Sequence, residues 1–205
     1  MDLGERRGLE TDVYQPAEDS QLLAEAACEG IDRDRDCERG RTTGRPDDRR
    51  LVLEVGTGSG YVASRVASET SARVIASDLN PHAVRQARRD GLEAVRADLV
   101  SAFADDVFDA VLFNPPYLPT EPDTEWDDWM ERALSGGEDG RAVIDPFLED
   151  VGRVLAPAGV VYLLVSSLTG VDGVVERAGR EGFSAVALAE ESFPFETLSI
   201  LKLVR

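Results

Sequence analysis

Two prolines follow an asparagine in Asn114-Pro115-Pro116-Tyr117, directly after the apolar run Phe108 to Phe113. Consecutive prolines fix φ at about −65° and lack N–H donors, so nearby carbonyl groups stay unpaired. The Asn114 side-chain carbonyl and the Pro115 backbone carbonyl could each accept one hydrogen of a substrate amine or amide. Tyr117 would then offer a flat surface to a planar group. The alternative is a strand end closed by a proline turn, with Tyr117 as a packing residue.

A glycine-rich turn, Gly56-Thr57-Gly58-Ser59-Gly60, lies between the apolar run Leu51 to Val55 and a segment of helical character, Tyr61 to Glu69. Glycines permit positive φ and close backbone approach, so such a turn can hold part of a nucleotide-like cofactor against the helix N-terminus. The dinucleotide pattern G-x-G-x-x-G would need glycine where the chain has Tyr61. Together with Glu54, the turn fits E-x-G-x-G-x-G, which favours S-adenosylmethionine over NAD.

Two carboxylates are placed to bind the rest of such a cofactor. Asp78 ends the short run Val74 to Asp78 about twenty residues after the glycines, where ribose hydroxyl groups are expected. Asp98 follows Ala94 to Ala97 and could accept a hydrogen bond from the adenine amino group. Each acid taken singly could be a solvated carboxylate at a strand end. Their order and spacing together favour cofactor binding.

The elements that must position these residues alternate between strand and helix from Leu51 onward, and a helix should begin at Asn80-Pro81. This alternation predicts an α/β fold with a parallel sheet covered on both faces. The last two strands lack a helix between them and should form an antiparallel hairpin. Ligands of open α/β sheets lie outside the carboxyl ends of the strands, so the glycine turn, both acids and Asn114 should meet there. Strands are expected over residues 51–55, 73–78, 93–97, 108–113, 160–166, 185–189 and 197–204.

The composition argues against several classes of function. A formal net charge of −18 repels phosphate backbones and argues against a nucleic-acid substrate. Cys28, Cys37 and the single histidine, His82, lack metal-ligand spacing, so no metal site is expected. The apolar runs predict neither a membrane segment nor a secretory signal, and the thiols should be reduced in a cytoplasmic protein. Lys202 is the only lysine, a bias typical of halophilic proteins.

The N-terminal part is expected to contain one helix and one insertion. Pro16 to Glu29 should be helical, with Glu18 and Asp19 complementing the positive end of the helix dipole. Gly30 to Arg50 is rich in Asp, Arg and Gly and has almost no apolar residues, so it should be a flexible surface loop. The 205 residues, 42% of them hydrophobic, are expected to form a single domain.

A long segment, Leu118 to Ile144, follows the proline motif and contains Trp126, Trp129 and the run Gly136-Gly137-Glu138-Asp139-Gly140. It could cover the acceptor site, with the glycines as hinges and the aromatic residues lining a peptide entry. The alternative is a surface connection whose tryptophans only pack on the rest of the chain.

Taken together, the chain resembles the HemK-type S-adenosylmethionine-dependent methyltransferases, which methylate the glutamine side-chain amide of translation termination factors. VYQPAEDSQLL at its start resembles the short archaeal and eukaryotic branch, which lacks the N-terminal helical domain of the bacterial enzymes. The resemblance implies a Rossmann-like, seven-stranded class I methyltransferase sheet whose last strand is antiparallel, and it favours the covering role for Leu118 to Ile144. Four motifs carry it: Val13 to Leu23, EVGTGSG at Glu54 to Gly60, DLNP at Asp78 to Pro81 and NPPY at Asn114 to Tyr117.

The resemblance also implies roles and partners. Asn114, Pro115 and Tyr117 would act on the glutamine of a Gly-Gly-Gln motif in a class I peptide release factor. A small zinc-binding activator of the Trm112 type would be a partner. Tyr14 to Ser20 would fold over the cofactor, although an ordinary capped helix is the alternative. The implied contacts of S-adenosylmethionine are Ser20, Glu54, Gly56, Thr57, Gly58, Gly60, Asp78, Leu79, Asp98, Leu99 and Asn114.

Two other functions stay open at this point. An N6-adenine or other exocyclic-amine nucleic-acid methyltransferase would use the same Asn-Pro-Pro-Tyr chemistry, but it would normally add a basic groove or a target-recognition domain, and the sequence shows neither. A non-catalytic cofactor-binding protein is the second alternative. The intact Gly56, Gly58, Asp78 and Asn114 argue against it.

Overall fold

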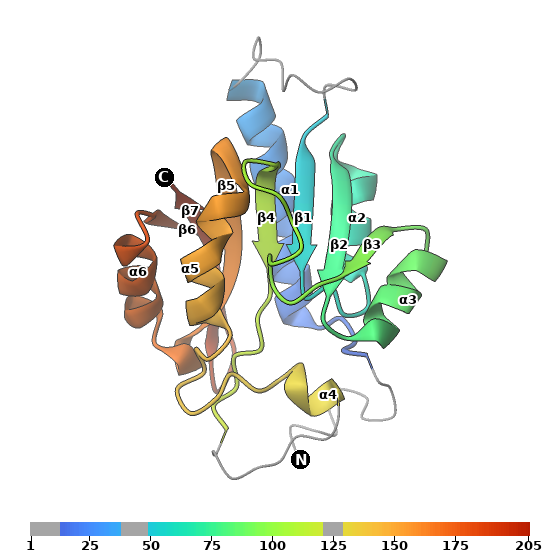
Figure 1. Ribbon diagram of the computed structural model, residues 1–205. Coiled ribbons are helices and arrows are strands. Elements are labelled where there is room, and N and C mark those ends of the chain that lie inside the picture. The colour runs from blue at the N-terminus through green and yellow to red at the C-terminus, as the bar shows by residue number, and fades with distance from the viewer. Residues whose placement is uncertain (1–12, 38–48, 121–128) are drawn as a thin grey trace.

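A seven-stranded sheet with helices on both faces forms the centre of the computed structural model, which describes residues 13–37, 49–120 and 129–205 (Figure 1). The strand order is β3-β2-β1-β4-β5-β7-β6. Neighbouring strands pair in parallel from β3 to β5, whereas β7 is antiparallel to both β5 and β6. The expected sheet and its terminal hairpin are confirmed. The strands are β1 (Leu51–Val55), β2 (Arg73–Asp78), β3 (Glu93–Arg96), β4 (Phe108–Phe113), β5 (Leu155–Ser166), β6 (Ser184–Ser192) and β7 (Thr197–Val204).

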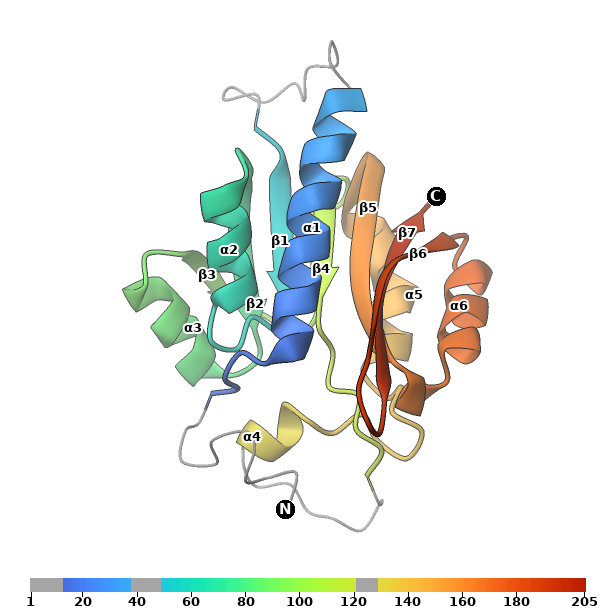
Figure 2. The ribbon, with the colours of Figure 1, turned by 180° about the vertical axis from the view of Figure 1, so that it is seen from behind.

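The helices divide between the two faces of the sheet, as the front and back views show (Figures 1 and 2). Helices α1 (Glu18–Cys37), α2 (Tyr61–Glu69) and α3 (Pro81–Arg89) pack on one face. Helices α5 (Ile144–Val154) and α6 (Val171–Arg180) pack on the other. A single turn, α4 (Trp129–Arg132), lies below the carboxyl ends of the strands in both views. A 3₁₀ turn, η1 (Ser167–Thr169), joins β5 to α6.

Alternating strand residues build a separate core on each face. On β5, Tyr162 and Leu164 point toward α1, and Leu163 and Val165 toward the α5 side; all four are fully buried. A strand buried on both faces needs a nearly continuous apolar run, and such runs are the sequence signal of the central strands. Among the described residues, no helix is long and apolar enough to cross a membrane.

Helix α1 corrects the prediction of a loop from Gly30 onward. The helix continues through Gly30 and Ile31 to Cys37, and Ile31 is buried in the core. A Cβ at Gly30 would lie 2.3 Å from the Tyr162 hydroxyl oxygen, so glycine is what lets the helix approach β5. The glycine that suggested a helix end therefore marks a close contact. Residues 38–48 of the expected insertion lie outside the described residues.

Helix α3 begins as its sequence predicts. The Asn80 side chain accepts a hydrogen bond from the His82 backbone N–H at 2.8 Å, and Pro81 occupies the first helical position. This cap fixes the chain directly after Asp78, at the end of β2.

Candidate active site

A pocket of about 280 Å³ opens where the carboxyl ends of β1, β2 and β4 meet. It lies at the point where strand order reverses, because β1 pairs with β2 on one side and β4 on the other. The pocket lining includes all three residues predicted to act on the acceptor, Asn114, Pro115 and Tyr117. Ten of the predicted cofactor contacts also line it: Ser20, Glu54, Gly56, Thr57, Gly58, Asp78, Leu79, Asp98, Leu99 and again Asn114.

Among the predicted cofactor contacts, all of which lie in the described part of the chain, Gly60 is the one that does not line the pocket. It precedes α2 with φ +83°, and a Cβ there would lie 3.0 Å from Leu92 Cδ1. Gly60 therefore allows the turn to pack closely beneath α3 and its following loop. The sequence pattern could not separate this packing glycine from the two glycines that face the pocket.

Asp78 joins the glycine turn to the end of β2. Its Oδ2 accepts from the Gly58 N–H at 2.9 Å, and its Oδ1 accepts from the Asn80 N–H at 2.8 Å. Burial raises the pKa of Asp78, against the lowering effect of these hydrogen bonds. The carboxylate therefore fixes the shape of the turn and still presents oxygen lone pairs to the pocket.

Glu54 is buried at 3% exposure near the end of β1, and its Oε2 accepts hydrogen bonds from the Thr57 hydroxyl and, at 3.1 Å, from the Ala63 N–H. These bonds tie the strand to the first turn of α2. Burial of the carboxyl group outweighs the lowering effect of these hydrogen bonds and raises the pKa of Glu54 from 4.5 to about 8. The folded protein thus favours the protonated form of Glu54 near neutral pH.

The raised pKa of Glu54 predicts how stability depends on pH. A folded state that holds a proton more tightly than the unfolded chain loses stability as pH rises from 4.5 to about 8. Gln keeps an acceptor for Thr57 and Ala63 and does not titrate, so the Glu54→Gln variant should lack this loss. Urea unfolding across this pH range should show the variant gaining at least about 1 kcal/mol relative to the native sequence. Parallel pH profiles for the two proteins would contradict the assignment.

Asn114 follows β4 and lines the pocket. Its Oδ1 is buried and, among the described residues, has no hydrogen-bond partner. A buried carbonyl oxygen without a partner costs free energy, so its position indicates a donor that arrives with a ligand. Pro115 and Tyr117 are both buried beside it, with Tyr117 at 3% exposure.

The glycine run after Leu118 holds the proline motif in place. The Gly136 N–H donates to the Leu118 carbonyl at 2.9 Å, and the Leu118 N–H donates to the Leu134 carbonyl at 3.0 Å. Gly140 lies so close to Tyr117 that a Cβ there would be 2.6 Å from the Tyr117 carbonyl oxygen. These contacts show that the glycine run braces the proline motif, and a hinge role for its glycines stays a prediction. Trp126 lies outside the described residues.

Gly140 offers a direct test of this brace. Gly140→Ala should displace Tyr117 and lower turnover by about tenfold or more, because small misplacements of positioning groups are costly. Gly182→Ala is the matched control, since Gly182 has φ +84°, close to the +75° of Gly140, but no heavy atom lies within 4 Å of the place that an added methyl group would take. Both variants should lose stability through the left-handed backbone, by about 1–2 kcal/mol. Equal turnover in the two would contradict the brace.

The start of α1 forms another wall of the pocket. Asp19 and Ser20 are buried and line it, and the Tyr14 hydroxyl donates to Asp19 Oδ2 at 2.7 Å. Pro16 and Glu18 are exposed and do not line the pocket, so only part of the expected segment faces it. The Tyr14 backbone carbonyl would be 3.4 Å from a Cβ at Gly58, which places this segment directly over the glycine turn.

Helix α4 contributes two residues to the pocket, of which Trp129 was expected from the sequence as a possible lining residue and Arg132 was missed. Trp129 and Arg132 line the pocket, and the Arg132 guanidinium lies 5.3 Å from the centre of the Trp129 ring. Arg132 is the only basic residue of the lining in the described part of the chain. Trp129 could be suspected from its aromatic character. Arg132 is the only basic residue between Arg96 and Arg141, within an acidic stretch, and this contrast in charge is the signal that could have found it.

Known proteins agree with this geometry. The sequence matches the model of the methyltransferase domain family over residues 52–135. It is 33% identical to a putative protein N5-glutamine methyltransferase of Methanocaldococcus jannaschii over 94% of this chain and 92% of that protein. It is 29% identical to the human methyltransferase HEMK2 over 97% and 92% of the two chains.

A solved structure extends the similarity to three dimensions. The chain matches a structure of the E. cuniculi Mtq2–Trm112 complex, which is responsible for methylation of the eRF1 translation termination factor, with a TM-score of 0.71 and 30% identity. The match covers 95% of this chain and 99% of that one.

The sheet order, the glycine turn and the pocket at the strand ends define a class I methyltransferase that depends on S-adenosylmethionine. Within that class, the chain belongs to the HemK2/Mtq2-type family of protein N5-glutamine methyltransferases, in its short archaeal and eukaryotic branch.

Proposed function

We propose that this protein methylates the side-chain amide nitrogen of the glutamine in the Gly-Gly-Gln motif of a class I peptide release factor. The observation that carries the proposal is the buried, unpartnered Oδ1 of Asn114 in the lining of the pocket, within the described residues. A glutamine amide presents two N–H groups, and one of them can satisfy this oxygen. The similarity to Mtq2, whose complex with Trm112 methylates eRF1, supports the same class of acceptor.

The pocket residues fit S-adenosylmethionine, because acceptor oxygens and two pocket-facing glycines stand where an adenosyl group needs them. When bound, the donor supplies the methyl group, whose carbon–sulfur bond breaks as a carbon–nitrogen bond forms, leaving S-adenosylhomocysteine. Asp78 would bind the ribose hydroxyl groups and Asp98 the adenine amino group. The other donor contacts would be Ser20, Glu54, Gly56, Thr57, Gly58, Leu79 and Leu99, with Gly60 supporting the turn from outside the pocket.

Asn114 and Pro115 would compensate for the weak nucleophilicity of an amide nitrogen. The lone pair of that nitrogen is shared with its carbonyl group, so it attacks poorly unless it is held in one orientation. Acceptance of one N–H by Asn114 Oδ1 and of the other by the Pro115 carbonyl would aim the lone pair and stabilise the positive charge that develops on nitrogen. The methylated nitrogen is acidic and loses its extra proton to water afterwards, so the site needs no strong general base.

A small zinc-binding activator of the Trm112 type is the proposed partner, by analogy with the E. cuniculi complex. Co-expression with the activator from the same organism should increase the yield of soluble enzyme and its activity. Expression of the chain alone with full solubility and turnover would argue against a required partner. We also propose a cytoplasmic, salt-rich setting for a single domain of 205 residues, from the charge of −18 and the single lysine.

The decisive experiment supplies the enzyme, with and without activator, with methyl-labelled S-adenosylmethionine and the release factor of the same organism. Peptide sequencing by mass spectrometry should place one methyl group on the glutamine of the Gly-Gly-Gln motif. A release factor in which that glutamine is replaced by asparagine should stay unlabelled. Label on nucleic acid, or on another residue of the release factor, would overturn the proposal.

A further inference from the structure

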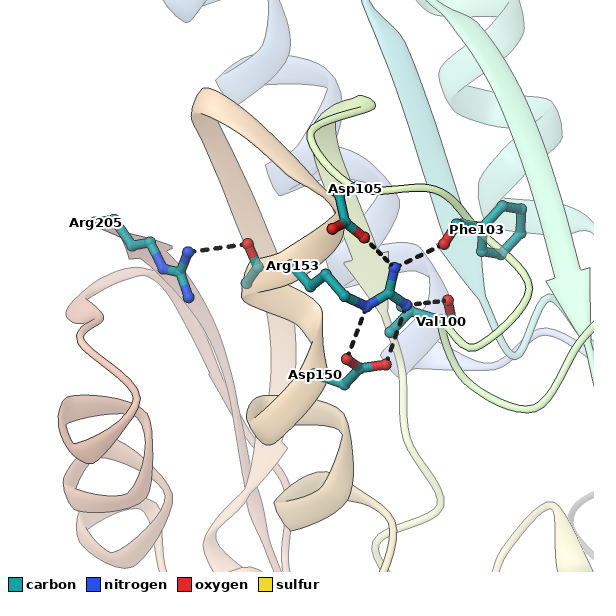
Figure 3. Close-up of polar contacts among 7 residues, drawn as sticks. Val100, Phe103, Asp105, Asp150, Arg153 and Arg205 are labelled. Carbon is teal, nitrogen blue, oxygen red and sulfur yellow. Dashed lines mark hydrogen bonds and ion pairs between the residues drawn. The ribbon is translucent and has the colours of Figure 1, made fainter.

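Arg153 of α5 binds the back of the loop that joins β3 to β4 (Figure 3). Its Nη1 donates to the Phe103 carbonyl at 2.8 Å, and its Nη2 donates to the Val100 carbonyl at 3.2 Å. The front of the same loop carries Asp98 and Leu99, which line the pocket, whereas Arg153 does not line it. One guanidinium thus holds, from outside the pocket, the backbone of a loop that forms part of its wall.

Two carboxylates fix the direction of this guanidinium. Asp150, on the same helix, accepts from Nε at 3.0 Å, and Asp105, in the loop, accepts from Nη1 at 2.8 Å. Hydrogen bonds to Asp150 and then to Asp105 raise the pKa of Arg153, so the side chain stays charged. On the other side, Arg205 donates to the Gly152 carbonyl at 2.9 Å and anchors this end of α5 (Figure 3). The loop is therefore held by a helix that is itself fixed.

The loop needs such support because its backbone has positive φ at two non-glycine residues, and at one of them, Leu99, this conformation is strained. Leu99 has φ +47° and Asp106 has φ +57°, and they are the non-glycine residues with positive φ in the described part of the chain. Asp tolerates the left-handed conformation, whereas a leucine persists in it only where the surroundings fix it. The Val100 carbonyl bound by Arg153 comes directly after Leu99, and the Asp106 N–H donates to the Arg153 carbonyl at 3.0 Å. Arg153 therefore contacts the chain beside the strained Leu99 and at Asp106.

We propose that Arg153 is a positioning residue for the methyl donor, which keeps Asp98 and Leu99 in the shape that receives the adenine ring. The inference rests on the proposed function, in which these two residues bind the adenosyl group. A purely structural role would lower stability without changing which nucleoside the pocket prefers. Preference for adenine over an analogue that lacks its amino group is therefore the discriminating measurement.

The test compares Arg153→Met with Arg177→Met by calorimetric binding of S-adenosylhomocysteine and of S-inosylhomocysteine, in which oxygen replaces the adenine amino group. Arg177 is a matched control because it also binds a carboxylate of α5, Glu149, and a second acid, Glu181, but has no hydrogen bond or ion pair to a pocket-lining loop within the described part of the chain. Arg153→Met should lower the affinity for S-adenosylhomocysteine by about tenfold or more. It should also reduce the ratio of the affinities for S-adenosylhomocysteine and S-inosylhomocysteine by at least about fivefold. Arg177→Met should change neither the affinity for S-adenosylhomocysteine nor this ratio of affinities by more than about twofold.

Arg153→Lys keeps the charge and can bind one carbonyl, so it should retain part of the affinity that Arg153→Met loses. The lysine variant replaces the methionine variant in this test if the methionine variant does not fold. Unchanged affinity for S-adenosylhomocysteine in folded Arg153 variants would overturn the proposal, as would equal weakening of both ligands. Failure of the native protein to bind S-adenosylhomocysteine would instead contradict the proposed function. Binding by the native protein thus tests the proposed function, and binding by the Arg153 variants tests the role of Arg153.

Discussion

The Asn114→Ala variant should turn over about 100-fold or more slowly than the native enzyme, with its affinity for S-adenosylhomocysteine nearly unchanged. The reason is the buried Oδ1 of Asn114, which among the described residues has no partner and would meet the amide only as it reacts. An interaction that strengthens in the transition state lowers turnover when it is lost, and it leaves ground-state binding of the donor largely intact. The residual rate would come from the Pro115 carbonyl, which the substitution leaves in place.

Turnover at saturating donor and release factor, together with calorimetric affinity for S-adenosylhomocysteine, measures this effect. Asn114→Leu is the volume control, because leucine fills a similar space and has no acceptor oxygen, so it should be as slow as alanine. Asn114→Asp keeps an acceptor at the same position and should retain more activity than leucine. Native turnover in the alanine variant would remove Asn114 from the mechanism.

Asp78→Ala should have the opposite kinetic signature, with donor affinity reduced about 30-fold or more and turnover at saturating donor close to native. Asp78 accepts two backbone N–H groups, from Gly58 and Asn80, and hydrogen bonds to charged groups contribute about 1.5–3 kcal/mol each. Without the carboxylate, the turn loses its shape and the ribose loses its proposed acceptor. Calorimetry with S-adenosylhomocysteine gives the affinity directly.

Asp109→Ala is the matched control for Asp78. The Asp109 Oδ2 also accepts from a backbone N–H, that of Leu51 at 2.7 Å, but it lies at the opposite end of β1 and does not line the pocket. Both variants lose a partly buried acceptor, so both should be less stable in urea, and only Asp78→Ala should lose affinity for S-adenosylhomocysteine. Similar affinities in the two variants would show that Asp78 is structural alone.

The sequence predicted those parts of the fold and site that depend on local pattern. The central strands are buried on both faces and form continuous apolar runs, and the helix at Pro81 has a cap and a proline at the expected positions. The glycine turn, Asp78, Asp98 and Asn114 each end or follow a strand. The general rule for open α/β sheets was therefore enough to place them at one edge.

The parts that could not be predicted depend on contacts between distant residues. Gly30 resembles a helix end until the ring of Tyr162 is seen beneath it. The close approach of Gly140 to the Tyr117 carbonyl has no local signal, because the two residues are 23 positions apart in the chain. The carbonyls bound by Arg153 are 50 and 53 residues away in the chain, and no local pattern encodes such a distance.

The segment that contains Tyr14 and Asp19 lies over the Gly58 turn, far from it in sequence, and a bound donor would touch both. A ligand held only by the folded state raises the free energy of unfolding by about 2.7 kcal/mol at a hundredfold excess over its Kd. Limited proteolysis should therefore be slower in the presence of S-adenosylhomocysteine than in its absence, because a bound donor would tie the segment at the start of α1 to the glycine turn.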